Sequence, residues 1–168
     1  MTEPRDHLIA WLKDAHAAEE QAVTMLDKMA GRLENYPHLK ARVQQHVEES
    51  RSQADRIRGC LQRYDSDTSS LKEMGTKMMG FVQGLSGVFA DDEVVKGVLA
   101  SYAFEHMEIA SYKILISAAR TLGDVETVRV CEEILQEELA MAKWLEDNFD
   151  NVIEKFFALE RAGQTAKH

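Results

Sequence analysis

Glutamates occupy positions in this sequence where the surrounding pattern predicts buried side chains. Apolar residues recur every three or four positions along four long segments, and glutamates interrupt them on the same face. An ionised glutamate is rarely buried without a partner, because removing its charge from water is costly. The glutamates concerned are Glu19, Glu49, Glu105, Glu108 and Glu138. Carboxylates gathered inside one bundle repel each other and require protons or cations, so the sequence predicts a buried cation site.

These glutamates also match in height along their helices. Glu19 and Glu49 stand at nearly equal distances along the chain before and after the first expected turn, near Asn35. Glu108 and Glu138 stand at equal distances before and after the turn expected in the second hairpin. At a rise of about 1.5 Å per helical residue, the two members of each pair reach nearly the same level. We therefore expect these four side chains to converge in one buried cluster.

A constant offset of 89 residues relates the two halves of the chain. The pairs at this offset are Glu19 and Glu108, Glu49 and Glu138, and His16 and Glu105. Such an offset is typical of a duplicated helical hairpin in which each copy contributes half of one site. On this interpretation the cluster is a dinuclear metal centre, a known use of helical bundles. The alternative is that the glutamates lie on faces that reach solvent and bind nothing.

The spacing of the apolar residues predicts an all-α chain. The expected helices cover residues 6–33, 38–64, 71–86, 92–121, 124–148 and 150–161. The short helix over 71–86 is expected in a long crossover, and the helix over 150–161 is expected to dock on one end of the bundle. Two antiparallel hairpins joined by a long crossover favour a ferritin-like four-helix bundle over a simple up-down bundle.

Composition and charge restrict the class of protein. The 168 residues suit a single domain, here residues 1–168, and 45% hydrophobic residues can form a sizeable core. A net charge of −9 argues against nucleic acid as the main partner. No stretch approaches about 18 uncharged apolar residues, so no membrane span is expected. The first residues lack the pattern of a signal peptide, so secretion is not expected. With only Cys60 and Cys131, both on packed stripes, a disulfide scaffold is excluded and a cytoplasmic location is expected.

Four segments resemble the YciE/YciF group of bacterial ferritin-like stress proteins and keep the order of its motifs. These segments are Leu12–Gln21, His46–Gln53, Phe104–Tyr112 and Leu135–Glu138, and the resemblance spans most of residues 6–149. It implies a ferritin-like bundle, a rubrerythrin-type di-iron or other di-metal site, a homodimer and a role in stress response. Glu105 and Glu108 fit the pattern that rubrerythrins carry on the third helix.

The histidines of that pattern are missing from this sequence. Ferritins and rubrerythrins normally carry Glu-x-x-His on the second and fourth helices, whereas Glu49 is followed by Ser52 and Glu138 by Met141. An aspartate that the YciE/YciF pattern tends to carry four residues after Glu138 is replaced by Ala142. Fewer ligands imply weaker metal binding, a different metal or loss of the site.

Two histidines could compensate. His46 lies on the inward stripe one turn before Glu49, so both side chains could reach one ion. His16 lies one turn before Glu19 and could be a ligand or could orient one. Tyr102 and Tyr112 flank the expected site by about a turn each, and core packing with a satisfied hydroxyl is expected for them.

The expected cofactor is dinuclear iron, with manganese as the alternative, because carboxylates are hard oxygen donors. Glu49 and Glu138 would bridge the ions, with Glu19 and one of Glu105 or Glu108 as terminal ligands. The candidate reactions are Fe(II) oxidation and peroxide reduction, and the lack of a Cys-x-x-Cys domain calls for an external electron donor. The alternative is a non-catalytic helical interaction protein with a degenerate metal site and a functional dimer surface.

Overall fold

The computed structural model describes residues 3–64 and 90–168. Within these ranges the chain forms α-helices and no strand: α1 (Pro4–Arg32), α2 (Pro37–Gln62), α4 (Glu93–Thr121), α5 (Val125–Asp147) and α6 (Phe149–Arg161). The all-α prediction is therefore confirmed, and these helix ends lie within two residues of the expected ones. The helix expected over residues 71–86 lies outside the described residues.

Local sequence signals explain where the helices begin and end. Pro4 and Pro37 stand at the first turns of α1 and α2, where the missing amide hydrogen of proline breaks no helical hydrogen bond. Gly123 follows the end of α4 with a φ of 72°, a conformation that glycine adopts without steric cost. Asp124 then caps α5 by accepting a 3.1 Å hydrogen bond from the backbone N–H of Thr127.

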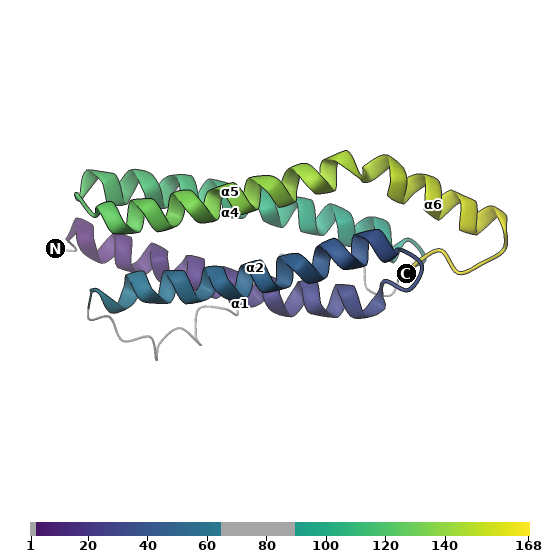
Figure 1. Cartoon of the computed structure of the whole chain (residues 1–168), viewed down its shortest axis with the longest axis horizontal. Helices are drawn as coiled ribbons and strands as arrows, with labels where there is room; N and C mark the ends of the chain where they lie inside the picture. Colours follow the sequence, from purple (N-terminus) through teal and green to yellow (C-terminus); the bar gives the residue numbers. More distant parts are fainter. Residues whose placement is uncertain (1–2, 65–89) are drawn as a thin grey trace.

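The helices pair into two antiparallel hairpins, as predicted. Helix α1 packs along α2 and helix α4 packs along α5, while α1–α4 and α2–α5 contacts join the hairpins into a four-helix bundle (Figure 1). Figure 1 also shows that α2 ends at the end of the bundle where α1 begins, whereas α4 begins at the opposite end. Helices α2 and α4 therefore run in the same direction, the arrangement of a ferritin-like bundle with a long crossover.

The apolar core is divided into two clusters. Cluster 1 lies toward the α1–α2 turn and is built around Leu26, Val43, Phe104, Met141 and Leu145. Cluster 2 lies toward the α4–α5 turn and is built around Leu12, Ile57, Cys60, Leu115 and Cys131. Both cysteines are buried and free, as expected. The predicted metal ligands come from the levels of the helices between these two clusters.

The C-terminal segment closes one end of the bundle. Helix α6 continues beyond the bundle, and the chain then returns to the α1–α2 turn (Figure 1). There the hydroxyl of Tyr36 donates a 2.6 Å hydrogen bond to the carbonyl of Ala166. The amide N–H of Val94 donates to the carbonyl of Lys167 at 2.8 Å. These contacts join the first turn, the start of α4 and the C-terminal segment.

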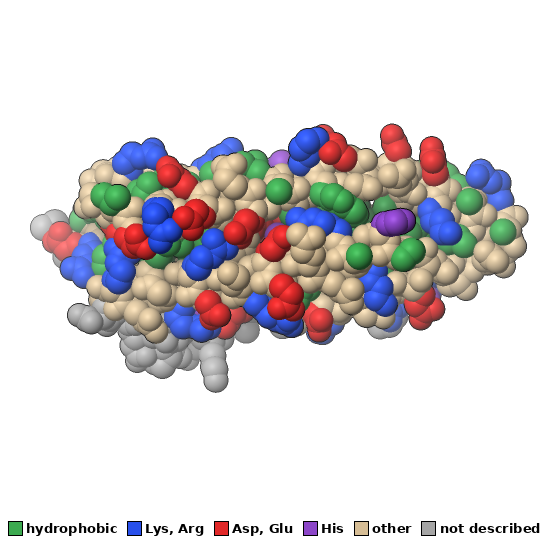
Figure 2. All heavy atoms as spheres, viewed as in Figure 1, with side chains coloured by type: hydrophobic (Ala, Val, Ile, Leu, Met, Phe, Trp, Pro, Cys, Tyr) green, Lys and Arg blue, Asp and Glu red, His purple; other side chains and the backbone are tan. Residues whose placement is uncertain are grey.

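Charges of both signs are interspersed over the visible face of the molecule (Figure 2). That face carries no large field of either sign, because acidic and basic side chains alternate along the bundle. Among the described helices, none is long and apolar enough to cross a membrane.

Candidate metal centre

Five of the six predicted ligands are buried between the two apolar clusters. They come from all four bundle helices: Glu19 from α1, His46 from α2, Glu105 and Glu108 from α4, and Glu138 from α5. None of these residues is more than 2% exposed. The spacing of apolar residues in the sequence therefore predicts correctly that these five side chains face the inside of the bundle.

Their donor atoms form two groups that share one residue. The first, here called the histidine group, contains His46, Glu105 and Glu138, and the second, here called the carboxylate group, contains Glu19, Glu108 and Glu138. Within each group the candidate ligand atoms all lie within 4.8 Å of one another. Because Glu138 belongs to both, its carboxylate lies where it could bridge two cations. The glutamates and the histidine of these two groups could therefore hold metal ions at two adjacent positions.

His46 is held by hydrogen bonds at both ring nitrogens. Its Nε2 lies 3.1 Å from Glu105 Oε2 and 3.5 Å from Glu138 Oε2, and its Nδ1 lies 2.6 Å from Glu49 Oε2. Burial alone would lower the pKa of His46, but the charge of Glu105 and the hydrogen bonds to the surrounding carboxylates raise it to about 12. In the metal-free protein the ring therefore carries a proton and neutralises part of the carboxylate charge.

Glu49 does not join the buried cluster, contrary to our expectation. Its side chain is 23% exposed, and its carboxylate contacts Arg42 at 3.2 Å and accepts a 2.8 Å hydrogen bond from Gln45. Burial would raise the pKa of Glu49, but the hydrogen bond to His46 and the charge of Arg42 lower it to about 2. Glu49 thus faces the outer nitrogen of His46, while the inner nitrogen faces the cluster.

The oxygens of the buried glutamates have few hydrogen-bond partners in the part of the protein that the structure describes. Glu19 accepts a hydrogen bond from the hydroxyl of Tyr112, as expected for a buried tyrosine. Both oxygens of Glu108, and one oxygen each of Glu19, Glu105 and Glu138, have no hydrogen-bond partner among the described residues. Buried carboxylate oxygens without partners are costly, which fits a site that takes up cations.

Electrostatics favour the same interpretation. Burial first, and then the negative charge of neighbouring glutamates, raises the pKa values of Glu19 and Glu108 well above their usual range. Burial raises the pKa of Glu105 to about 8, although the charge of His46 acts in the opposite direction. For Glu138 burial also acts to raise the pKa, but its interactions with His46, Glu105 and Gln53 lower it overall. In the metal-free protein the cluster therefore holds protons where metal ions would otherwise balance its charge.

Gln53 is a site residue that the sequence pattern alone does not indicate. Gln53 is fully buried, and its Nε2 donates to Glu138 Oε1 at 2.5 Å and to Glu137 Oε2 at 2.8 Å. The signal was present, because Gln53 follows His46 on the inward stripe of α2. An uncharged amide on such a stripe does not by itself suggest a metal site.

The remaining polar candidates lie outside the two donor groups. His16 is buried, with its Nδ1 3.8 Å from Glu20 Oε2. Ser52 is exposed, so that position of α2 faces away from the cluster, whereas Met141 is buried and packs in cluster 1. Tyr102 is half-buried and meets the ring of Phe149 edge-on at 5.2 Å between ring centroids.

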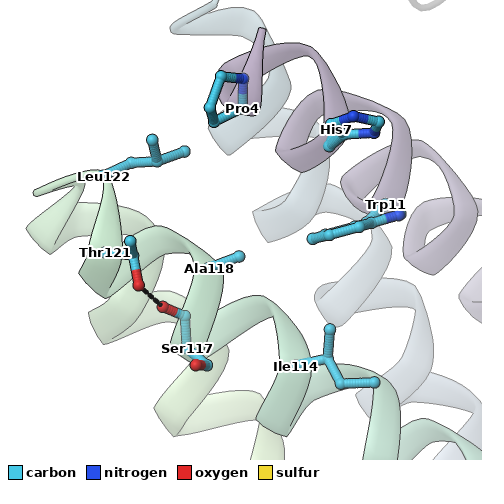
Figure 3. Close-up of a pocket in the computed structure, with 8 residues that line it drawn as sticks. All are labelled: Pro4, His7, Trp11, Ile114, Ser117, Ala118, Thr121 and Leu122. Atoms are coloured by element: carbon cyan, nitrogen blue, oxygen red, sulfur yellow. Dashed lines mark hydrogen bonds between the residues drawn. The ribbon is translucent and has the colours of Figure 1, made fainter. Parts of the chain in front are cut away.

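A surface hollow lies between α1 and α4 near the start of the chain (Figure 3). His7, Trp11, Ile114 and Leu122 are among the residues that line it, and no carboxylate lines it. It is mainly apolar and contains none of the predicted ligands, so it does not contribute to the candidate metal centre.

Comparison with known proteins identifies relatives over nearly the whole chain. The model of a domain of unknown function, DUF892, matches residues 3–158. Protein YciF of Escherichia coli strain K12 is 30% identical over 155 residues, which make up 89% of this chain and 92% of YciF. The YciE/YciF resemblance read from the motifs is thus confirmed.

Solved structures of three relatives share the fold. A protein from Xanthomonas campestris pv. campestris aligns with a TM-score of 0.80 and 40% identity, over 95% of this chain and 99% of that chain. The Escherichia coli stress protein YciF aligns with a TM-score of 0.78 and 26% identity, over 92% of this chain and 99% of YciF. YcfI from Rhodopseudomonas palustris, proposed to be a structural protein, aligns with a TM-score of 0.71 and 27% identity, over 86% and 94% of the two chains. The chain therefore belongs to the DUF892 family and is a relative of YciF.

Proposed function

We propose that this protein binds a dinuclear metal centre, with iron as the preferred metal and manganese as the alternative. The observation that carries the proposal is the shared position of Glu138 in two buried donor groups. Carboxylates and one imidazole form a hard donor set, which suits iron and manganese better than copper(I). Glu138 would bridge the two ions, His46 and Glu105 would complete one position, and Glu19 and Glu108 would complete the other.

The charge of the cluster supports two divalent ions rather than one. Four ionised glutamates bring four negative charges into the bundle, and two divalent ions bring four positive charges. A neutral His46 adds a ligand without adding charge, so a loaded centre would be close to electrically balanced. Without metal the same balance requires protons, and the raised pKa values of Glu19, Glu105 and Glu108 follow from that need.

The surrounding residues prepare the site for chemistry. Glu49 accepts from Nδ1 of His46, which orients the ring and leaves Nε2 directed at the cluster. Tyr112 fixes one oxygen of Glu19 and leaves the other without a partner in the described part of the chain. The apolar clusters on both sides exclude bulk water. Bound Fe(II) would supply electrons to dioxygen or to peroxide and would itself be oxidised to Fe(III), and an external donor would return those electrons.

The biological setting is part of this proposal. The relative from Escherichia coli is described as a stress protein, and oxidation of Fe(II) or removal of peroxide would suit such a role. We place the protein in the cytoplasm as a homodimer, in line with the expectations from its sequence.

Metal analysis of protein purified without a histidine tag tests the proposal. We expect about two iron or manganese ions per chain, measured by mass spectrometry after anaerobic addition of Fe(II). No bound ion under these conditions would overturn the proposal. It would favour a non-catalytic structural or interaction protein, and the relative from Rhodopseudomonas palustris is proposed to be a structural protein.

A further inference from the structure

A row of polar side chains in contact with one another extends from the solvent to Glu138. It lies between α2 and α5, along a line here called the seam. Arg56 Nη2 lies 2.5 Å from Glu137 Oε2, and Arg56 Nη1 lies 4.0 Å from Glu133 Oε2. Gln53 Nε2 then joins Glu137 to Glu138, with distances of 2.8 and 2.5 Å to their carboxylate oxygens. Side-chain exposure falls from 49% at Glu133 to 35% at Glu137, and Gln53 and Glu138 are fully buried. This row of side chains therefore connects the surface with the candidate metal centre.

The buried part of this row contains an oxygen atom that has no hydrogen-bond partner among the described residues. Gln53 uses its Nε2 for both carboxylates, and its Oε1 is buried and has no hydrogen-bond partner within residues 3–64 and 90–168. An unpaired amide oxygen inside a protein is costly, and it is a good donor for a hard cation. The amide of Gln53 thus links the carboxylates of Glu137 and Glu138 through its nitrogen and keeps its oxygen unpaired.

The opposite approach, past Glu49, is less suited to cations. There the positive side chain of Arg42 lies 3.2 Å from Glu49, and the ring of His46 stands between Glu49 and the cluster. Both ring nitrogens of His46 are already hydrogen-bonded, so the ring has a fixed orientation. Each approach carries an arginine, Arg42 beside Glu49 and Arg56 beside Glu137. Past Glu49, however, a cation would meet an imidazole ring whose nitrogens are both hydrogen-bonded, whereas the seam leads to the amide of Gln53 with its unpaired oxygen.

We propose that the seam residues Glu133, Glu137 and Gln53 form the route by which a divalent cation passes from solvent to the metal centre. Glu133 and Glu137 attract the hydrated ion, and Oε1 of Gln53 accepts it before Glu138 does. Arg56 neutralises Glu137 when no ion is passing and must move aside when one arrives. This inference rests on the proposed function, because a route requires a centre that takes up metal.

The rate of Co(II) uptake by the metal-free protein tests the route. The visible absorption of Co(II) changes when protein ligands replace its water molecules, so stopped-flow absorption measures uptake and a titration measures affinity. For Glu137→Gln we expect uptake at low ionic strength to slow about 10-fold. The reason is that the negative charge of Glu137 raises the local concentration of cations at the solvent end of the seam. Release should slow equally, so the dissociation constant should stay within about two-fold. Arg56→Gln should instead accelerate uptake several-fold.

Glu132→Gln is the matched control. Glu132 is another exposed glutamate of α5, and its partner Arg120 lies 3.0 Å away on α4, outside the seam. The control removes the same charge from the same helix, and we expect it to leave the uptake rate within about two-fold of the original protein. Unchanged uptake in Glu137→Gln, or equal slowing in Glu132→Gln, overturns the route while the metal centre stands. Failure of the unmodified protein to bind Co(II) at all overturns both.

Discussion

The sequences of the two hairpins resemble each other at an offset of 89 residues, but the hairpins contribute unequally to the proposed metal centre. In α1 and α4 the offset of 89 residues holds, because Glu19 and Glu108 are both buried and belong to the same donor group. In α2 and α5 it fails, because Glu138 belongs to both donor groups whereas the side chain of Glu49 is 23% exposed.

The difference comes from one residue in a turn. Buried positions of α2 match those of α5 at an offset of 88 rather than 89: His46 with Ile134, Ser50 with Glu138, Gln53 with Met141, and Ile57 with Leu145. The connection from α1 to α2 covers residues 33–36, one residue more than the connection over 122–124. One residue corresponds to a rotation of about 100° in an α-helix, which moves Glu49 off the inward face. Ser50 takes the position that Glu138 has in α5.

Replacing the shared glutamate should have the largest effect on this asymmetry. Glu138→Gln removes the carboxylate common to both donor groups, so we expect the dinuclear centre to be lost and fewer than two ions to bind per chain. Glu49→Gln is the control at the position related by 89 residues, and it should keep two ions with about 10-fold lower affinity. Metal analysis and Fe(II) titration check both variants. Equal loss in both would mean that Glu49 is a bridging ligand.

His46 on α2 would give the proposed metal centre its nitrogen donor, and neither donor group contains a histidine of α5. We expect His46→Ala to weaken metal binding about 10–100-fold, because it removes a ligand and its oriented link to Glu49. Titration of the metal-free variant with Fe(II) under anaerobic conditions measures the change. Gln45→Ala, which also alters a contact of Glu49 but lies outside the donor groups, should change the affinity much less. An unchanged affinity in His46→Ala would indicate an all-carboxylate site and weaken the case for redox chemistry.

The sequence predicted most of the fold because helical periodicity is a local signal. Apolar spacing and the turn residues located the helices described here, and interruptions of that spacing identified Glu19, Glu105, Glu108 and Glu138. The position of Glu49 could not be read in the same way, because the face of α2 depends on the length of the preceding turn. Gln53 was missed because its role arises only from the carboxylates of α5 that it meets.

The pH dependence of stability should reveal the buried carboxylates in the metal-free protein. Glu105 has a pKa of about 8 when folded and about 4.5 when unfolded, so the folded state keeps a proton that the unfolded state releases. The free energy of unfolding should therefore fall as the pH rises from about 5 to 8, by up to about 1.4 kcal/mol per pH unit for each such group. His46, with a folded pKa of about 12, acts in the same direction above pH 6.5.

Urea denaturation of the metal-free protein at several pH values measures this slope. The lowered pKa of Glu49, about 2, acts only below about pH 4.5 and does not affect this range. Added Mn(II) should stabilise the protein most at the upper end of the range, because the ligands must release their protons to bind metal. A stability that stays constant or rises between pH 5 and 8 without metal would contradict the proposed protonation of the cluster.

The smallest effect is expected at Ser50, the residue that corresponds to Glu138 when the helices are compared by burial. Its hydroxyl is buried and has no hydrogen-bond partner in the described ranges, so Ser50→Ala removes a polar group that gains nothing from the fold. We expect the free energy of unfolding to stay constant or to rise by up to about 1 kcal/mol, measured by urea denaturation. The variant should still bind two metal ions, since neither donor group contains Ser50. A loss of metal comparable to that in Glu138→Gln would mean that both hairpins contribute to the bridge, and that the extra residue in the first turn moves the contribution of α2 from Glu49 to Ser50.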